Sequence, residues 1–301
     1  MDQTVLSLLS NLKGSLTFDE PLKKHTWLGV GGPAEVMFCP QDAQDLSFFL
    51  KNRPKDLPFY ILGGGSNLLI RDGGIKGVVI KLNSPYFKQI YLEGDALRCF
   101  SGCPNTSLKN FLIENARSDL EFLCSIPGTI GGSVKSNAGC FGSSVSDVLI
   151  SADLMDGKGN IKTLTYPDFH FAYRHCEIPS EHIVLSALFK TGSNTPENIK
   201  KTLDEQALYR KTHQPVGVQT AGSTFKNPPE AKAWELIKKA GCDTLQIGGA
   251  KVSDKHCNFL INTGTATAED FEVLGNTIVE KVRKKTGITL EWEVQIMGQK
   301  R

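Results

Sequence analysis

Three consecutive glycines, Gly63-Gly64-Gly65, separate two apolar runs near the start of the chain. Residues without a Cβ reach positive φ at no steric cost and let the backbone lie very close to a ligand. Successive N–H groups in such a turn form a concave anion site, to which Ser66 and Asn67 add side-chain donors. The stretch therefore predicts a phosphate-binding cradle, and a plain glycine-rich hairpin turn is the alternative that it leaves open.

The residues around this loop predict strands on both sides of it. Residues 59–62 are apolar, and the loop is followed by Leu68-Leu69-Ile70, an Asp72-Gly73-Gly74 turn and Val78-Val79-Ile80. A Rossmann turn or a Walker loop opens a helix instead, and neither GxGxxG nor a GK[ST] ending is present here. We therefore expect a cradle between strands.

A second glycine-rich stretch, SIPGTIGGSVKSNAGCFG, covers Ser125–Gly142. Its Pro-Gly start and its Asn137-Ala138-Gly139 turn predict a long loop, and long loops in compact domains are usually functional. The alternative is an Ω-loop that is packed by its own side chains.

Composition excludes several classes of protein. A chain of 301 residues predicts two domains or three small ones, with ample length for a buried core. The net charge of +2 argues against a dedicated nucleic-acid surface. The longest apolar run, around Ile183–Phe189, is far too short to cross a bilayer, and the first residues lack the basic start of an export signal. We expect a cytoplasmic protein with neither a membrane nor a nucleic-acid partner.

The cysteines do not form a motif. Without CxxC pairs or an export signal, they are expected to be reduced thiols, neither catalytic nor paired, and no metal site is predicted. There are eight, at positions 39, 99, 103, 124, 140, 176, 242 and 257.

The order of patterns divides the chain into three predicted regions. Residues 1–83 are expected to form a small α/β unit, with an amphipathic first helix and a strand, turn and strand over Thr26–Cys39. A helix capped by Asp42 and a strand then lead into the glycine loop.

Residues 84–213 are β-rich, with strands at residues 90–92, 97–100, 148–155, 161–164 and 183–189, and a helix over Thr106–Asn115. Pro196–Lys211 is the predicted linker helix. Residues 214–290 contain predicted helices at Ala231–Ala240 and Ala268–Lys285. Single strands are expected at Ile247–Val252, Phe259–Ile261 and Leu290–Met297, and residues 291–301 are a candidate to return to the first region.

Two glycine-rich loops at this separation resemble the flavin-binding half of vanillyl-alcohol-oxidase-type flavoproteins. Successive motifs also resemble those of the UDP-N-acetylenolpyruvoylglucosamine reductase family of bacterial peptidoglycan synthesis, in its shorter form. They are GGGSNLLI (63–70), PGTIGGSV (127–134) with NAG (137–139), FAYR (171–174), AGSTFKNP (221–228) and LEWEVQIMG (290–298).

This resemblance implies an α+β protein with a vanillyl-alcohol-oxidase/PCMH-type FAD-binding fold. Two α+β subdomains would bind FAD, and a C-terminal α/β domain would bind the substrate, in the bacterial cytoplasm. FAD would be non-covalent, because no flavin-linking histidine or cysteine stands beside the loops. The residues implied to hold it are Gly63, Gly64, Gly65, Ser66, Asn67, Pro127, Gly128, Thr129, Gly131, Gly132, Asn137, Ala138 and Gly139.

The resemblance also implies the reaction and its catalytic residues. NADPH would reduce FAD, and the reduced flavin N5 would deliver hydride to the β-carbon of UDP-N-acetylglucosamine enolpyruvate, giving UDP-N-acetylmuramate. Ser223 matches the residue that protonates the α-carbon. Arg174 supplies a permanent planar cation for the carboxylate as its negative charge grows. Glu293 would polarise the developing acid.

Strand alternation places Glu291 and Glu293 on the same side, so only the family motif selects Glu293. Tyr173, Lys226 and Asn227 match positions that bind the uridine diphosphate part of the substrate. A solvated surface lysine is the alternative for Lys226. After Arg174, Cys176 stands where a serine is expected, which leaves one contact of the motif open.

Other functions of the same fold remain possible at this stage. A flavin electron-transfer subunit would need a partner with metal clusters but not Ser223 or Glu293. A FAD-dependent oxidase would react rapidly with oxygen, and a nucleotide-sugar-binding protein would hold no flavin. We expect the reductase, without an obligate protein partner.

Overall fold

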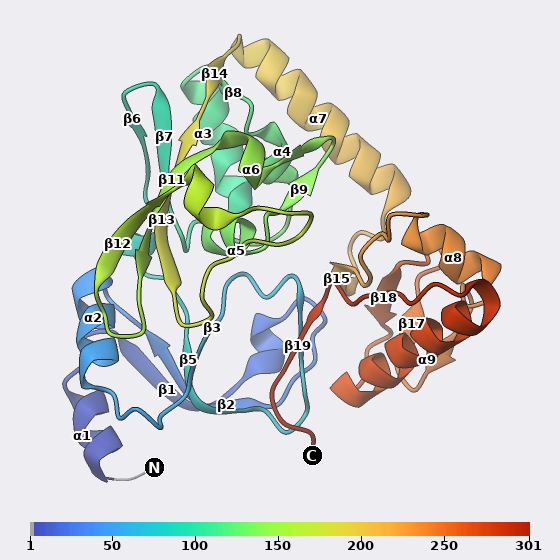
Figure 1. Ribbon diagram of the computed structural model, residues 1–301, viewed down its shortest axis with the longest axis horizontal. Coiled ribbons are helices and arrows are strands. Elements are labelled where there is room, and N and C mark those ends of the chain that lie inside the picture. The colour runs from blue at the N-terminus through green and yellow to red at the C-terminus, as the bar shows by residue number, and fades with distance from the viewer. Residues whose placement is uncertain (1–2) are drawn as a thin grey trace. The chain divides into compact units, whose positions relative to one another are not determined.

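The computed structural model describes residues 3–301, which fall into two compact units (Figure 1). The first unit contains the residues up to Phe18, Val36–Gly64 and Gly77–Leu208, and the second contains Asp19–Glu35, Gly65–Lys76 and Tyr209–Arg301. The glycine loop is divided between them, because Gly64 ends one segment of the first unit and Gly65 begins a segment of the second. The three predicted regions stay a prediction.

One sheet of the first unit contains the strand that leads into the glycine loop. Its order is β1-β2-β5-β3, and β3 runs parallel to β5. Helix α2 begins after Asp42, whose carboxylate accepts a hydrogen bond from the Asp45 N–H at 2.9 Å, as predicted. Phe38 and Phe49 pack within its core. The elements are α1 (Gln3–Ser10), β1 (Ser15–Pro21), β2 (Pro33–Cys39), α2 (Ala43–Asn52), β3 (Phe59–Ile61) and β5 (Ile75–Ile80).

A five-stranded antiparallel sheet forms the β-rich part of the first unit (Figure 1). Its order is β12-β11-β13-β7-β6, and helices pack against it around Leu112, Phe169 and Phe189. The strands are β6 (Ile90–Glu93), β7 (Ala96–Phe100), β11 (Leu149–Met155), β12 (Ile161–Thr165) and β13 (Ile183–Lys190), which confirms the predicted set. The helices include α3 (Leu108–Glu114), α4 (Glu121–Ser125), α5 (Ile130–Lys135), α6 (Val145–Val148) and α7 (Pro196–His213).

The second unit contains a sheet of order β15-β18-β17-β16 and a core around Phe225, Phe271 and Ile278. Helix α9 begins with the predicted capping box between Thr267 and Asp270. The elements are β15 (Gln219–Ser223), α8 (Ala233–Lys239), β16 (Gln246–Ile247), β17 (Ala250–Val252), β18 (Phe259–Asn262) and α9 (Ala268–Thr286).

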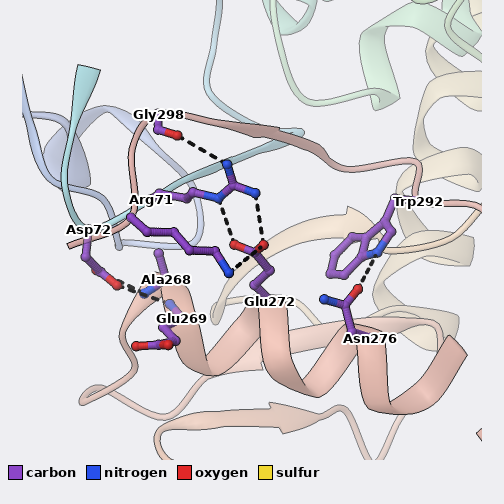
Figure 2. A network of polar contacts seen from close by, with 9 residues as sticks. Arg71, Asp72, Ala268, Glu269, Glu272, Asn276, Trp292 and Gly298 are labelled. Atoms are coloured by element: carbon purple, nitrogen blue, oxygen red, sulfur yellow. Dashed lines mark hydrogen bonds and ion pairs between the residues drawn. The ribbon is translucent and has the colours of Figure 1, made fainter. Parts of the chain in front are cut away.

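The strand after the glycine loop, β4 (Leu68–Ile70), pairs in parallel with the last strand of the chain, β19 (Gln295–Met297). Just beyond β4, the Arg71 guanidinium forms two hydrogen bonds with Glu272 of α9, at 2.8 and 2.9 Å (Figure 2). The Asp72 carboxylate accepts hydrogen bonds from the first two N–H groups of α9, each at 3.1 Å. Side chains next to β4 therefore fix the first two turns of α9.

Several expected elements are wrong in detail. Thr26–Val30 is a loop rather than a strand, because positive φ at Gly29 and Gly31 breaks the extended path. Ser125–Gly142 is not one long loop, since α5 lies within it. Ile247–Val252 is a hairpin of β16 and β17 rather than one strand.

The last predicted strand is also shorter than expected. Regular pairing covers only Gln295–Met297, and within Leu290–Val294 it is limited to one bridge, between Trp292 and Phe225. Glu293 therefore lies outside the regular strand.

No helix within residues 3–301 is long and apolar enough to cross a membrane. In the same residues, no group of three or more His, Cys, Asp and Glu side chains could hold a metal ion, and none of the eight cysteines forms a disulfide.

The Arg71–Glu272 pair gives a pH-dependent stability. The hydrogen bonds and charge of Arg71 hold the pKa of Glu272 below its usual 4.5. This stabilisation is complete above pH 4.5 and is lost as the pH falls through the lowered pKa of the native state. We expect Glu272→Gln to lower the free energy of unfolding by about 1–3 kcal/mol at pH 7 and by less at pH 4.

Urea unfolding of both proteins across this pH range measures the difference. Glu280→Gln is the matched control on α9, because Glu280 pairs with Lys284 in a more exposed position and should matter less. A difference between Glu272→Gln and wild type that grows toward low pH would contradict the assignment.

All eight cysteines should react with a thiol reagent, but at different rates. Burial raises the pKa of Cys103 to about 11 and that of Cys124 to about 12. In the native protein these two thiols should react with a disulfide reagent on the order of 10²-fold more slowly than free cysteine at pH 8. Denatured, unreduced protein should yield eight thiols, and a yield of six or fewer would show a disulfide.

Candidate functional site

In the first unit, the two glycine-rich stretches meet at Gly64 and Gly128. A Cβ on Gly64 would lie 2.8 Å from the Gly128 Cα, and a Cβ on Gly63 would lie 3.1 Å from Thr129 Oγ1. Within residues 3–301, the N–H groups of Gly63, Gly64, Gly128 and Thr129 donate no hydrogen bond to a protein acceptor. The backbones approach so closely only because side chains are absent.

This arrangement fits the pyrophosphate of a dinucleotide such as FAD. A metal-free pyrophosphate is best bound by many backbone N–H groups, and here unpaired groups come from two segments far apart in the sequence. Gly63, Gly64, Gly128 and Thr129 are the residues that would hold it, and the cradle stays a prediction.

The rest of the first loop belongs to the second unit. Gly65 has φ +66°, and a Cβ there would overlap the His25 carbonyl oxygen. The Gly65 carbonyl accepts a hydrogen bond from the Trp27 N–H at 3.0 Å. These contacts require glycine at position 65 for packing, independently of any ligand.

Asn67, the last residue of the loop motif, has a role that its pattern does not predict. Its amide Nδ2 donates to the Glu293 carbonyl at 3.0 Å, and its own carbonyl accepts from the Gln295 N–H at 3.1 Å. Asn67 thus fixes the backbone on both sides of Val294. One donor of its side chain is already used within the protein.

In the first unit, Arg174 lies at a tight turn beside the NAG motif. Ala172 and His175 exchange both backbone hydrogen bonds, and Arg174 at the turn has φ +54°. Its Nη2 donates to the Gly139 carbonyl at 2.8 Å, while Asn137 Nδ2 donates to the Ala172 carbonyl at 2.9 Å. The structure therefore brings together Asn137, Gly139 and Arg174. The Cys176 thiol donates instead to the Lys135 carbonyl.

Ser223 ends β15 in the second unit, after a register shift in the pairing of β15 with β18. Gly222 there has φ +80° and open space around the position of a Cβ. Asn258 holds the following residues: its carbonyl accepts from the Thr224 N–H at 2.7 Å, and its side-chain amide makes two hydrogen bonds with the Phe225 backbone. Ser223 itself is half-buried.

The segment that carries Glu293 lies alongside the segment that carries Ser223. The Glu293 N–H donates to the Thr224 carbonyl at 2.8 Å, and the Lys226 N–H donates to the Glu291 carbonyl at 2.9 Å. The two acids differ in environment, because the Glu291 side chain is 72% exposed and pairs with Lys226 Nζ at 2.6 Å, whereas Glu293 is half-buried. The structure thus distinguishes Glu291 from Glu293, which the alternation of side chains along a strand could not do.

The three predicted substrate residues have different surroundings. Tyr173 is 53% exposed, and the Arg174 guanidinium lies 5.0 Å from its ring. Lys226 is paired with Glu291, and Asn227 Oδ1 accepts a hydrogen bond from the Ala233 N–H at 2.9 Å, at the start of α8. Asn227 therefore also caps a helix.

The sequence places Asn258 near a segment of substrate contacts in the family but assigns it no role; the residue is buried, and its side-chain amide makes two hydrogen bonds with the Phe225 backbone. Nothing in its surrounding residues distinguishes it from a turn asparagine. The neighbouring His256 Nδ1 accepts a hydrogen bond from the Asn258 N–H at 3.2 Å, and burial lowers the pKa of His256. That histidine is thus a neutral acceptor near neutral pH.

Comparison with known proteins first defines the class. Residues 34–165 match the family model described as FAD binding domain. The structure of an Acremonium strictum glucooligosaccharide oxidase aligns with a TM-score of 0.51 at 14% identity, covering 96% of this chain and 59% of the oxidase, which shows the fold alone. The chain has the FAD-binding fold of this class of flavoproteins, and the predicted α+β fold class is confirmed.

The family follows from nearer relatives. Residues 214–297 match the model for the UDP-N-acetylenolpyruvoylglucosamine reductase C-terminal domain. Proteins with that reductase's name from Rickettsia typhi and a Bradyrhizobium strain are 44% and 43% identical, covering 97% and 96% of this chain and 99% and 94% of theirs. The Thermus caldophilus reductase structure aligns with a TM-score of 0.81 at 31% identity, covering 95% of this chain and 99% of that one. The chain belongs to the UDP-N-acetylenolpyruvoylglucosamine reductase family.

The approach of Gly64 to Gly128 gives a test of the cradle. We expect Gly64→Val to lose most of its bound FAD, because the added side chain must displace the Gly128 backbone. The ratio of flavin to protein absorbance after gel filtration measures occupancy. Lys76→Val is the control, since it adds valine at an exposed position of β5. Full FAD content in Gly64→Val would undo the assignment of the loop.

Proposed function

We propose that this protein catalyses the FAD-dependent reduction of UDP-N-acetylglucosamine enolpyruvate to UDP-N-acetylmuramate with NADPH. The observation that carries the proposal is the identity of 43–44% with reductases of this name along 96–97% of the chain. The two family models that match cover both glycine-rich stretches, within residues 34–165, and the segments of Ser223 and Glu293, within residues 214–297. FAD, when bound, would accept reducing equivalents from NADPH and pass them on to the substrate.

Ser223 provides the proton that the substrate α-carbon needs. A serine hydroxyl is a weak acid, so it must be aimed at the carbon and its segment must be held still. The backbone hydrogen bonds of Asn258 to Thr224 and Phe225 fix the residues directly after Ser223. This support favours the role of Ser223 as proton donor.

Arg174 and Glu293 act on the carboxylate of the substrate. Negative charge grows on that carboxylate during reduction, and a preorganised guanidinium stabilises it without reorganisation. The hydrogen bond to the Gly139 carbonyl and the hairpin at Ala172–His175 limit the positions that Arg174 can take. The Glu293 backbone is fixed by Thr224 and Asn67, which supports its role as the second polarising group.

Tyr173, Lys226 and Asn227 bind the uridine diphosphate part. Lys226 has three N–H donors, so its pairing with the exposed Glu291 leaves donors for a diphosphate. Asn227 uses Oδ1 as a helix cap, and its Nδ2 is the group that we assign to the substrate.

We place the reaction in the bacterial cytoplasm, with the enolpyruvyl nucleotide and NADPH as its only required partners. Neither a nucleic acid nor a membrane nor a second protein takes part. An electron-transfer subunit of the same fold would need a protein partner, and an oxidase would use oxygen instead of the enolpyruvyl substrate.

The role of Ser223 predicts a separation of the two half-reactions. Ser223→Ala should bleach the flavin with NADPH at close to the wild-type rate, because that step needs no proton on carbon. Return of the flavin colour with the enolpyruvyl substrate should slow by about 10²–10⁴-fold, the usual worth of general acid catalysis. Stopped-flow absorbance measures each step by itself.

Ser223→Cys is the matched variant, and its thiol should recover part of the lost rate because it can also donate a proton. If Ser223→Ala slows both half-reactions equally, Ser223 is a structural residue and this role is wrong.

A further inference from the structure

Gly275 occupies an unfavourable place for a glycine. It lies in the interior of α9, where glycine costs about 1 kcal/mol relative to alanine. Gly275 is buried, and its conformation is helical, so neither a turn nor positive φ explains the residue. The reason must lie in what packs against it.

The indole ring of Trp292 fills the space that a side chain at position 275 would need. A Cβ on Gly275 would overlap Cζ2 and Cη2 of Trp292 and would lie 3.2 Å from Cζ3. The indole Nε1 donates to Asn276 Oδ1 at 3.3 Å, which holds the ring beside this turn of α9 (Figure 2). The Phe225 ring contacts it as well, with the two centroids 5.2 Å apart.

How closely the Trp292 indole packs against α9 affects the position of the next residue, Glu293. Adjacent Cα atoms are held about 3.8 Å apart by the trans peptide, so a shift of Trp292 is passed on to Glu293. Trp292 also forms the bridge with Phe225, and the Glu293 N–H donates to the Thr224 carbonyl. The residue that packs on Gly275, Trp292, is thus the direct neighbour of Glu293 in the chain. Both residues also contact the segment that follows Ser223.

We propose that Gly275 is a positioning residue for Glu293, acting through Trp292. The inference rests on the proposed function, because it takes Glu293 as a group that acts on the substrate. Because Gly275 has no side chain, the Trp292 indole packs directly against α9. The packed indole in turn fixes the backbone position of Glu293. Misplacement of a catalytic group by about 1 Å can cost about 10²-fold in rate.

The surroundings of the ring make the proposal testable. A small apolar cavity borders Trp292 and is lined by Leu69, Phe271 and Val294 among others. The atoms that a Cβ at position 275 would meet are the far end of a side chain rather than backbone, so Gly275→Ala is expected to fold with a shifted ring.

The first readout is structural. The chain has three tryptophans, so the ¹H–¹⁵N spectrum of the purified protein contains three indole signals, and Trp292→Phe identifies the one from Trp292. Gly275→Ala should shift this signal and leave the other two in place. Val273→Ala, at an exposed position of the same helix, is the control and should leave all three unchanged.

The second readout is kinetic. Gly275→Ala should bleach with NADPH at the wild-type rate but regain flavin colour with the enolpyruvyl substrate about 10²-fold more slowly. The double variant Gly275→Ala/Trp292→Phe should recover part of that loss, because the smaller ring no longer meets the new methyl group. If Gly275→Ala does not fold, Trp292→Phe alone must show the same separation of half-reactions, since it leaves the contact at Gly275 unfilled.

An unmoved Trp292 signal, equal slowing of both half-reactions, or no recovery in the double variant would each overturn the proposal. A wild-type protein that never regains colour with the enolpyruvyl substrate would instead overturn the proposed function. The two failures are therefore distinguishable.

Discussion

The hydrogen bonds that hold residues 291–295 are the constraint on which the second unit depends. Only Gln295 of this segment belongs to a regular strand, and contacts with other parts of the chain hold the residues before it. Thr224 accepts the Glu293 N–H, Asn67 donates to the Glu293 carbonyl, and Trp292 packs against α9. Because each contact comes from a different part of the sequence, the position of one acid depends on the folding of the whole unit.

The same unit shows why the glycine loop does more than expose its backbone. Asn67 ends the loop, β4 follows, and Arg71 and Asp72 then bind α9 through Glu272 and the first N–H groups of the helix. A residue expected to face a cofactor thus belongs to a continuous set of contacts that reaches the second turn of α9. In the first unit, by contrast, the cradle depends on missing side chains, with two backbones in contact and their N–H groups unpaired.

Much of the fold could be predicted because its patterns are local. The strands of the five-stranded sheet, the Asp42 cap and the capping box of α9 each follow from local patterns or from residues three positions apart, whereas the order of the strands in the sheet does not. The discontinuous units could not be predicted, because a partition of Asp19–Glu35 and Gly65–Lys76 with the C-terminal residues leaves no trace in chain order. The Thr26–Val30 loop was missed because apolar residues there serve the core without forming a strand.

The candidate site divides in the same way. The glycines and the motif residues could be identified from the sequence. Three other features are tertiary contacts that the sequence does not show: the different surroundings of Glu291 and Glu293, the hydrogen bonds of Asn258 to Phe225, and the packing of Trp292 on Gly275. The roles of Ser223, Arg174 and Glu293 remain predictions.

The central claim is that bound FAD links NADPH to an enolpyruvyl nucleotide, and an anaerobic equivalence titration tests it most directly. The purified protein is bleached with one equivalent of NADPH and then titrated with UDP-N-acetylglucosamine enolpyruvate, while flavin absorbance and product mass are followed. The account predicts full return of colour at one equivalent of substrate, with UDP-N-acetylmuramate formed in equal amount. Colour that returns only when oxygen is admitted would contradict it, as would a purified protein that holds no flavin.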